Sequence, residues 1–198
     1  MPKGIVLTIE EQNRRRQEIF DAVVDTFIAN GFIETSMREI ADLAGMGKSS
    51  LYDYFATKDD ILVFVMEQSM RYITDNSRRI NTQPISVEVR LRQIIEMHLD
   101  YVVSNKKLFY LFSYEGRRLS LENQKRMQQG RYVYQDMLRG LIEEGIAEGI
   151  FRQLDALLAA RMLINTLIPV VFTSRPTGSP REMMRETLDI FLNGIQKH

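Results

Sequence analysis

Apolar residues recur along most of the chain with the spacing of an amphipathic helix, and no segment alternates apolar and polar residues as a strand does. Between residues 12 and 30, Ile19, Val23 and Phe27 form one apolar face, and Gly31 follows where a helix commonly ends in a left-handed conformation. Because the same periodicity continues to the last residues, we expect an all-α protein.

Start signals divide this pattern into separate helices. Ser36 with Glu39 and Ser179 with Glu182 have the spacing of capping boxes, in which a hydroxyl and a carboxylate bind each other's backbone N–H groups. Gly45 ends one short helix, and Thr57 is expected to cap a longer one. Nine helices are predicted, at residues 12–30, 36–44, 48–54, 58–79, 86–104, 106–114, 120–144, 155–174 and 180–195.

Composition places the chain among globular proteins, with 44% hydrophobic and 26% charged residues. The chain contains no cysteine, which fits a reducing cytoplasm, and its first residues show no apolar run of signal-peptide length. The most apolar stretch, residues 157–172, is too short for a bilayer and contains Arg161 and Asn165. We therefore expect a cytoplasmic protein without a membrane partner.

Two short predicted helices, 36–44 and 48–54, are joined by a glycine-containing turn, which is the arrangement of a helix-turn-helix. In that motif the second helix enters the major groove of DNA, where each base pair displays a distinct pattern of donors and acceptors. The segments GFIETS (31–36), IADLAGM (40–46) and LYDYFATK (51–58) resemble the N-terminal signature of the TetR family of transcriptional regulators. The similarity extends from Asn13 to Ile73.

This resemblance implies a nine-helix, TetR-like architecture. Residues 1–58 would form a three-helix DNA-binding domain with its helix-turn-helix at about 36–55, and residues 59–198 a helical ligand-binding and dimerisation domain. The DNA-binding residues that it implies are Ser36, Met37, Arg38, Lys48, Ser49, Ser50, Tyr52, Asp53, Tyr54 and Lys58. Among them, Lys58 is expected to grip a phosphate, and Asp53, which would repel phosphate, could accept a hydrogen bond from cytosine. Gly47 and Ser49 depart from the family pattern, which often has serine and glycine there.

Net charge does not support DNA binding, because the chain has 26 basic and 26 acidic residues and the part up to Asp60 has seven basic against eleven acidic ones. The placement of Arg38, Lys48 and Lys58 around the motif supports it instead. The run 14–16, three arginines, fits either an arm that reaches phosphate or a solvated helix face.

Aromatic side chains at residues 98–112 suggest an apolar pocket with a few polar groups, the usual form of a small-molecule site between helices. The predicted ligand-binding residues are His98, Tyr101, Phe109, Tyr110 and Phe112, and the predicted effector is apolar or amphipathic. The resemblance also implies that the last two helices pair with a second copy of the chain. The apolar residues expected at that interface are Leu158, Met162, Leu167, Ile168, Val171, Leu188, Phe191, Leu192 and Ile195.

We interpret the chain as a homodimeric repressor that binds a palindromic DNA operator and is released by a small-molecule effector. No nucleophile elbow, phosphate-binding glycine loop or carboxylate dyad indicates an enzyme, and no cofactor is expected. His98 lacks companions at metal-ligand spacing, so no metal site is expected either. A helical scaffold that binds a protein partner is the alternative, and an enzyme is a more distant one.

Overall fold

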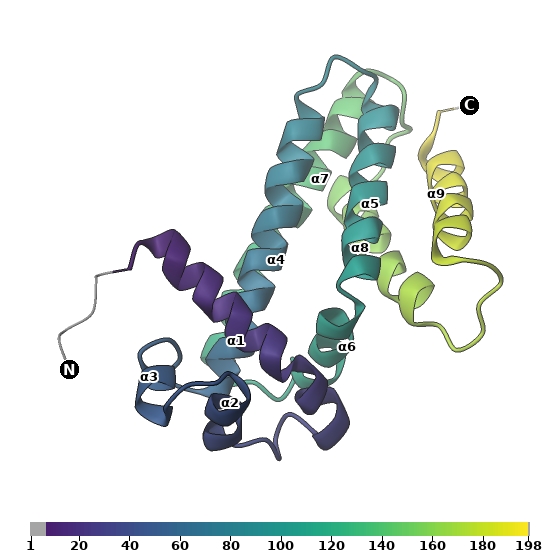
Figure 1. Ribbon diagram of the computed structural model, residues 1–198. Helices are drawn as coiled ribbons and strands as arrows, with labels where there is room; N and C mark the ends of the chain where they lie inside the picture. The colour runs from purple at the N-terminus through teal and green to yellow at the C-terminus, as the bar shows by residue number, and fades with distance from the viewer. Residues whose placement is uncertain (1–6, 198) are drawn as a thin grey trace. The chain divides into compact units, whose positions relative to one another are not determined.

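The computed structural model describes residues 7–197, apart from the side chains at positions 168 and 169. These residues form nine α-helices and no strand, which confirms the predicted fold class. The helices in Figure 1 are α1 (Ile9–Asn30), α2 (Met37–Leu43), α3 (Lys48–Tyr52), α4 (Lys58–Asn81), α5 (Val87–Ser104), α6 (Lys106–Glu115), α7 (Leu121–Ala147), α8 (Ala156–Phe172) and α9 (Pro180–Ile195).

Short side chains at helix starts determine several of these boundaries. Both predicted capping boxes form, at Ser36 with Glu39 and at Ser179 with Glu182. A third box joins Thr8 and Glu11, so α1 begins three residues before the predicted start at residue 12. The prediction missed it because Ile9 is exposed and polar residues follow, which leaves no apolar period in the first turns.

Helix α7 also extends beyond its predicted end at residue 144 and passes through Gly145. This glycine is required by close packing: a Cβ atom at this position would lie 2.3 Å from Cδ2 of Phe151, whose ring is buried. Gly45 has φ +64° and Gly149 φ +74°, so these two glycines have the left-handed conformation that ends a helix.

The first compact unit consists of residues 7–68 together with 107–127. Its interior contains aromatic rings from α1, α4 and the loops before α2 and α4. Phe27 and Phe32 form an edge-to-face pair at 5.0 Å, and Phe55 and Phe64 form another at 5.8 Å. The predicted domain boundary at residue 58 differs from this division, because α6 from residue 107 and the first turns of α7 belong to this unit.

The second compact unit consists of residues 69–106 and 128–197. Helices α5, α8 and α9 pack on one another there, around buried aliphatic side chains such as Leu91, Leu163 and Leu188. An isolated antiparallel bridge between Phe151 and Gln196 connects the end of α9 to the loop after α7.

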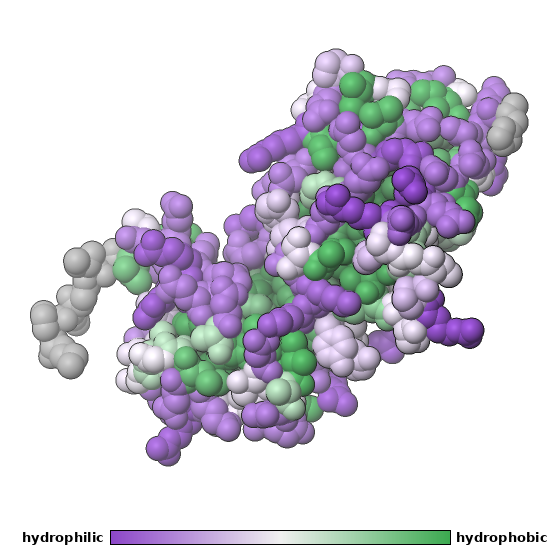
Figure 2. All heavy atoms as spheres, turned by 45° about the vertical axis from the view of Figure 1, so that its right-hand side comes forward, coloured by the Kyte–Doolittle hydropathy of each residue, from purple (hydrophilic) through white to green (hydrophobic). Residues whose placement is uncertain are grey.

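Charged and polar side chains cover most of the face visible in Figure 2, with apolar atoms between them. None of the described helices has the length and apolar character needed to cross a bilayer.

Candidate functional site

Helices α2 and α3 form a helix-turn-helix on an apolar base. Gly45 makes the turn, and the N–H of Met46 donates to the carbonyl of Ala41 over 3.0 Å. Ile40 and Leu51, one from each helix, are fully buried. Because these contacts hold the inner sides of both helices, their outer sides form the surface of the motif.

Seven of the ten predicted DNA-binding residues are exposed on this surface: Ser36, Arg38, Lys48, Ser49, Ser50, Tyr52 and Asp53. The Ser36 hydroxyl accepts from the N–H of Glu39 at 3.3 Å, so it also fixes the start of α2. The ammonium of Lys48 lies 5.8 Å from the centre of the Tyr52 ring. The exposed residues of the motif thus include two cationic side chains and several hydroxyl groups that can donate to phosphate or base edges.

The three remaining residues, Met37, Tyr54 and Lys58, are half-buried. Lys58 differs from the prediction. Its ammonium donates to the carbonyls of Phe32, at 2.7 Å, and Thr35, at 3.2 Å, and also to that of Ile33. It lies 5.2 Å from the Phe32 ring as well. An ammonium group has three donors, and here all three bind the loop before α2. We therefore propose a structural role for Lys58 in place of the expected phosphate grip.

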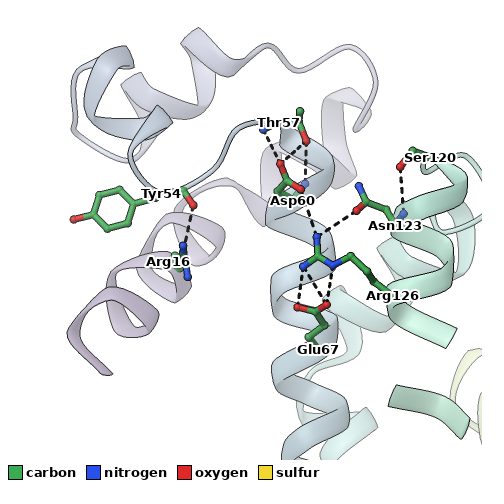
Figure 3. A network of polar contacts seen from close by, with 8 residues as sticks. All are labelled: Arg16, Tyr54, Thr57, Asp60, Glu67, Ser120, Asn123 and Arg126. Carbon is green, nitrogen blue, oxygen red and sulfur yellow. Dashed lines mark hydrogen bonds and ion pairs between the residues drawn. The ribbon is translucent and has the colours of Figure 1, made fainter. Parts of the chain in front are cut away.

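The arginine run separates into two kinds of residue. Arg14 and Arg15 are exposed and form ion pairs with Glu18. Arg16 instead donates from Nε to the carbonyl of Tyr54 at 3.3 Å (Figure 3). Its guanidinium lies within 6 Å of the Phe55 and Phe64 ring centres. Arg16 therefore links α1 to the end of the motif. It also lines a pocket of about 240 Å³.

Two of the predicted ligand-binding residues lie in the second unit. His98 is buried, and its Nδ1 lies 3.0 Å from the hydroxyl oxygen of Tyr134, a buried residue of α7. Burial lowers the pKa of His98 to about 3 and raises the pKa of Tyr134, so both side chains are uncharged near neutral pH. Tyr101 donates to the Ser69 hydroxyl at 3.0 Å, and burial raises its pKa.

Sequence reasoning did not select Tyr134, which lies 36 residues from His98. Tyr134 lies outside the aromatic-rich residues 98–112, and no local spacing relates it to His98. No group of three or more His, Asp or Glu side chains suited to a metal ion is present in the described part of the chain.

The other three predicted ligand-binding residues, Phe109, Tyr110 and Phe112, belong to α6 in the first unit. Phe109 is buried, whereas Tyr110 is 41% exposed and packs on the ring of Tyr114 at 4.6 Å. The five residues therefore do not form one cluster within either unit.

The predicted dimer residues divide into an exposed group and a buried group. Leu158 and Met162 on α8 are 53% and 57% exposed. The rest of the described set is mostly in the interior of its own chain: Leu167, Val171, Leu188, Leu192 and Ile195 are buried, and Phe191 is half-buried. The side chain of Ile168 is outside the described residues.

The apolar stripe of α9 is therefore a core stripe, because α9 packs on α5 and α8. The prediction that Leu188, Leu192 and Ile195 face a partner is corrected. The large apolar side chain that α9 does expose is Ile190, at 70%.

Two family descriptions match this chain. "Bacterial regulatory proteins, tetR family" matches residues 19–64, which include α2, α3 and the start of α4. "Tetracyclin repressor-like, C-terminal domain" matches residues 84–195, from just before α5 to the end of α9.

Individual proteins match over nearly the whole length. The "Fatty acid metabolism regulator protein" of Bacillus subtilis (strain 168) is 25% identical over 191 residues, which cover 94% of this chain and 98% of that protein. The "HTH-type transcriptional repressor KstR2" of Mycobacterium tuberculosis is 27% identical over 193 residues, covering 93% and 94%. The solved structure of KstR2, described as a ketosteroid transcriptional regulator, superimposes with a TM-score of 0.75 at 25% identity and covers 98% of both chains.

Proposed function

The chain belongs to the TetR family of bacterial regulatory proteins, and we propose that it is a ligand-responsive transcriptional repressor acting in the cytoplasm. As a homodimer it binds a palindromic DNA operator, with one α3 helix in each half-site, and a small effector releases it. The observation that carries this function is the exposed, cationic and hydroxyl-rich surface of α2 and α3 on its buried apolar base. Two recognition helices about 34–36 Å apart would match one turn of DNA.

The exposed residues suggest a division of roles on the operator. Arg38 and Lys48 neutralise phosphates or reach guanine, which displays two acceptors in the major groove. Ser49, Tyr52 and Asp53 face the groove, and the Asp53 carboxylate accepts from a cytosine amino group. An acidic side chain at this place disfavours contact with phosphate, so it favours a particular base instead.

The effector is proposed to be mostly apolar, with an uncharged polar group. His98 and Tyr134 are buried and neutral, and a buried site without free charge disfavours a charged group beside it. The names of two relatives, one for fatty acid metabolism and one for ketosteroids, support the mostly apolar character of the effector.

A titration with DNA from upstream of the protein's own gene tests the function. We expect a mobility shift at low concentration that survives excess unrelated DNA, and a shift that unrelated DNA removes equally well would refute the proposal. Release from that fragment is then compared between 1-dodecanol and dodecanoate, which share a chain and differ in charge. The alcohol is expected to be the more effective of the two.

A further inference from the structure

Arg126, in the second turn of α7, bridges two carboxylates of α4 (Figure 3). Its Nε and Nη2 donate to Oε1 and Oε2 of Glu67, each at 3.1 Å, which is the two-pronged geometry of a guanidinium on a carboxylate. Its Nη1 lies 3.7 Å from Oδ1 of Asp60. All three residues belong to the first compact unit.

Asp60 connects this arginine to the chain that follows the recognition helix. The other carboxylate oxygen of Asp60, Oδ2, accepts from the backbone N–H of Thr57 at 2.9 Å and from its hydroxyl at 2.8 Å. Thr57 lies five residues after Tyr52, where α3 ends. A displacement of Asp60 would therefore also move Thr57, and through the short loop before Thr57 it would move the end of α3.

The arginine is held in place on its own helix as well. Its Nη1 donates to the side-chain oxygen of Asn123 at 3.4 Å, and the N–H of Asn123 donates to the Ser120 hydroxyl that caps α7. The side chain of Arg126 is 41% exposed, and those of Glu67 and Asp60 are 35% and 29% exposed. The network is thus partly shielded from solvent, and the orientation of its arginine is fixed from α7.

We propose that Arg126 is a positioning residue through which α7 controls the orientation of the recognition helix. The inference rests on the proposed function, since it takes α3 to be the DNA-reading helix. Within the first unit, a shift of the first turns of α7 would therefore change the contacts of Arg126 with Asp60 and Glu67, and with them the start of α4.

The test uses the full-length, ligand-free protein and four variants: Arg126→Gln, Glu67→Gln, the double variant, and Lys125→Gln. Lys125 is an exposed cation next to Arg126, so its replacement is the charge-matched control. Hydrogen exchange of residues 53–62 is expected to become about twofold to fivefold faster in Arg126→Gln, as for the loss of a half-exposed ion pair, with little change in Tm. Lys125→Gln should exchange like the wild type, and the double variant no faster than the faster single one.

Binding to the upstream DNA separates positioning from direct contact. Arg126→Gln should weaken binding about twofold to fivefold while the slope of log affinity against log salt stays the same. A slope reduced by about one unit would instead make Arg126 a phosphate contact and overturn the proposal. Unchanged exchange in residues 53–62, or additive effects in the double variant, would also overturn it. If even the wild type fails to bind DNA, the proposed function fails, while the exchange measurement still decides whether Arg126 positions the start of α4.

Discussion

The ammonium of Lys58 is bound by three carbonyls of its own chain, and this determines what its removal should do. Lys58→Ala is expected to lower the free energy of unfolding by about 1–2 kcal/mol, because carbonyls of a partly buried loop lose a charged donor. Its operator affinity should fall without a change in salt slope. Arg38→Ala, at an exposed residue of the motif, should reduce the slope by about one unit. If the slope of log affinity against log salt falls equally in Lys58→Ala and Arg38→Ala, the structural role of Lys58 is contradicted.

His98 should make the protein sensitive to mild acid. In the unfolded chain a histidine gains a proton near pH 6.5, whereas burial lowers the pKa of folded His98 to about 3. The stabilisation from the neutral folded form is therefore complete above pH 6.5 and is lost as the pH falls from 6.5 toward 3. The loss should approach about 1.4 kcal/mol per pH unit.

Urea denaturation between pH 7 and pH 5 measures this loss, before most carboxylates titrate. His98→Gln should show a shallower dependence of the free energy of unfolding on pH, whatever its stability at pH 7. Equal dependence in the two proteins would mean that His98 does not remain neutral in the folded state.

At the scale of one element, α7 contains two glycines that should respond in opposite ways to alanine. At Gly145 the new Cβ would lie 2.3 Å from the buried Phe151 ring, so Gly145→Ala should cost about 1–3 kcal/mol of stability. At Gly140 nothing lies within 4 Å of the new atom, and Gly140→Ala should add about 0.5–1 kcal/mol because alanine favours the helix. Thermal denaturation of both variants checks the pair, and a stabilised Gly145→Ala would show that Phe151 moves freely.

At the scale of the whole molecule, we predict that a second copy binds over the exposed apolar side chains of α8. Leu158 and Met162 are more than half exposed, which is unusual for a pair of large apolar residues one turn apart unless a partner covers them. Met162→Asp is therefore expected to yield folded monomers that bind the operator weakly, because one half-site supplies only part of the affinity. Sedimentation and circular dichroism measure the two properties.

Leu188→Asp provides the contrast. Leu188 is fully buried in its own chain, so a carboxylate there should unfold the second unit rather than merely separate two protomers. A folded monomer from Leu188→Asp, or a stable dimer from Met162→Asp, would place the interface elsewhere.

Local chemistry was sufficient to predict the helices of the fold. Capping boxes act over three residues and apolar periodicity over one helix, so nine helices could be read from the order of the residues alone. The family resemblance implied the residues of the motif surface, such as Arg38 and Lys48, and both are exposed in the structure.

Only the tertiary structure decided which groups the buried and polar side chains contact. An amphipathic stripe shows that Leu188 and Leu192 are buried, but not whether their own chain or a partner buries them. Lys58 bonds carbonyls 23 to 26 residues away, His98 meets Tyr134 across 36 residues, and Arg126 meets Glu67 across 59. Such contacts depend on how separate helices pack, and helix periodicity carries no information about the partner face.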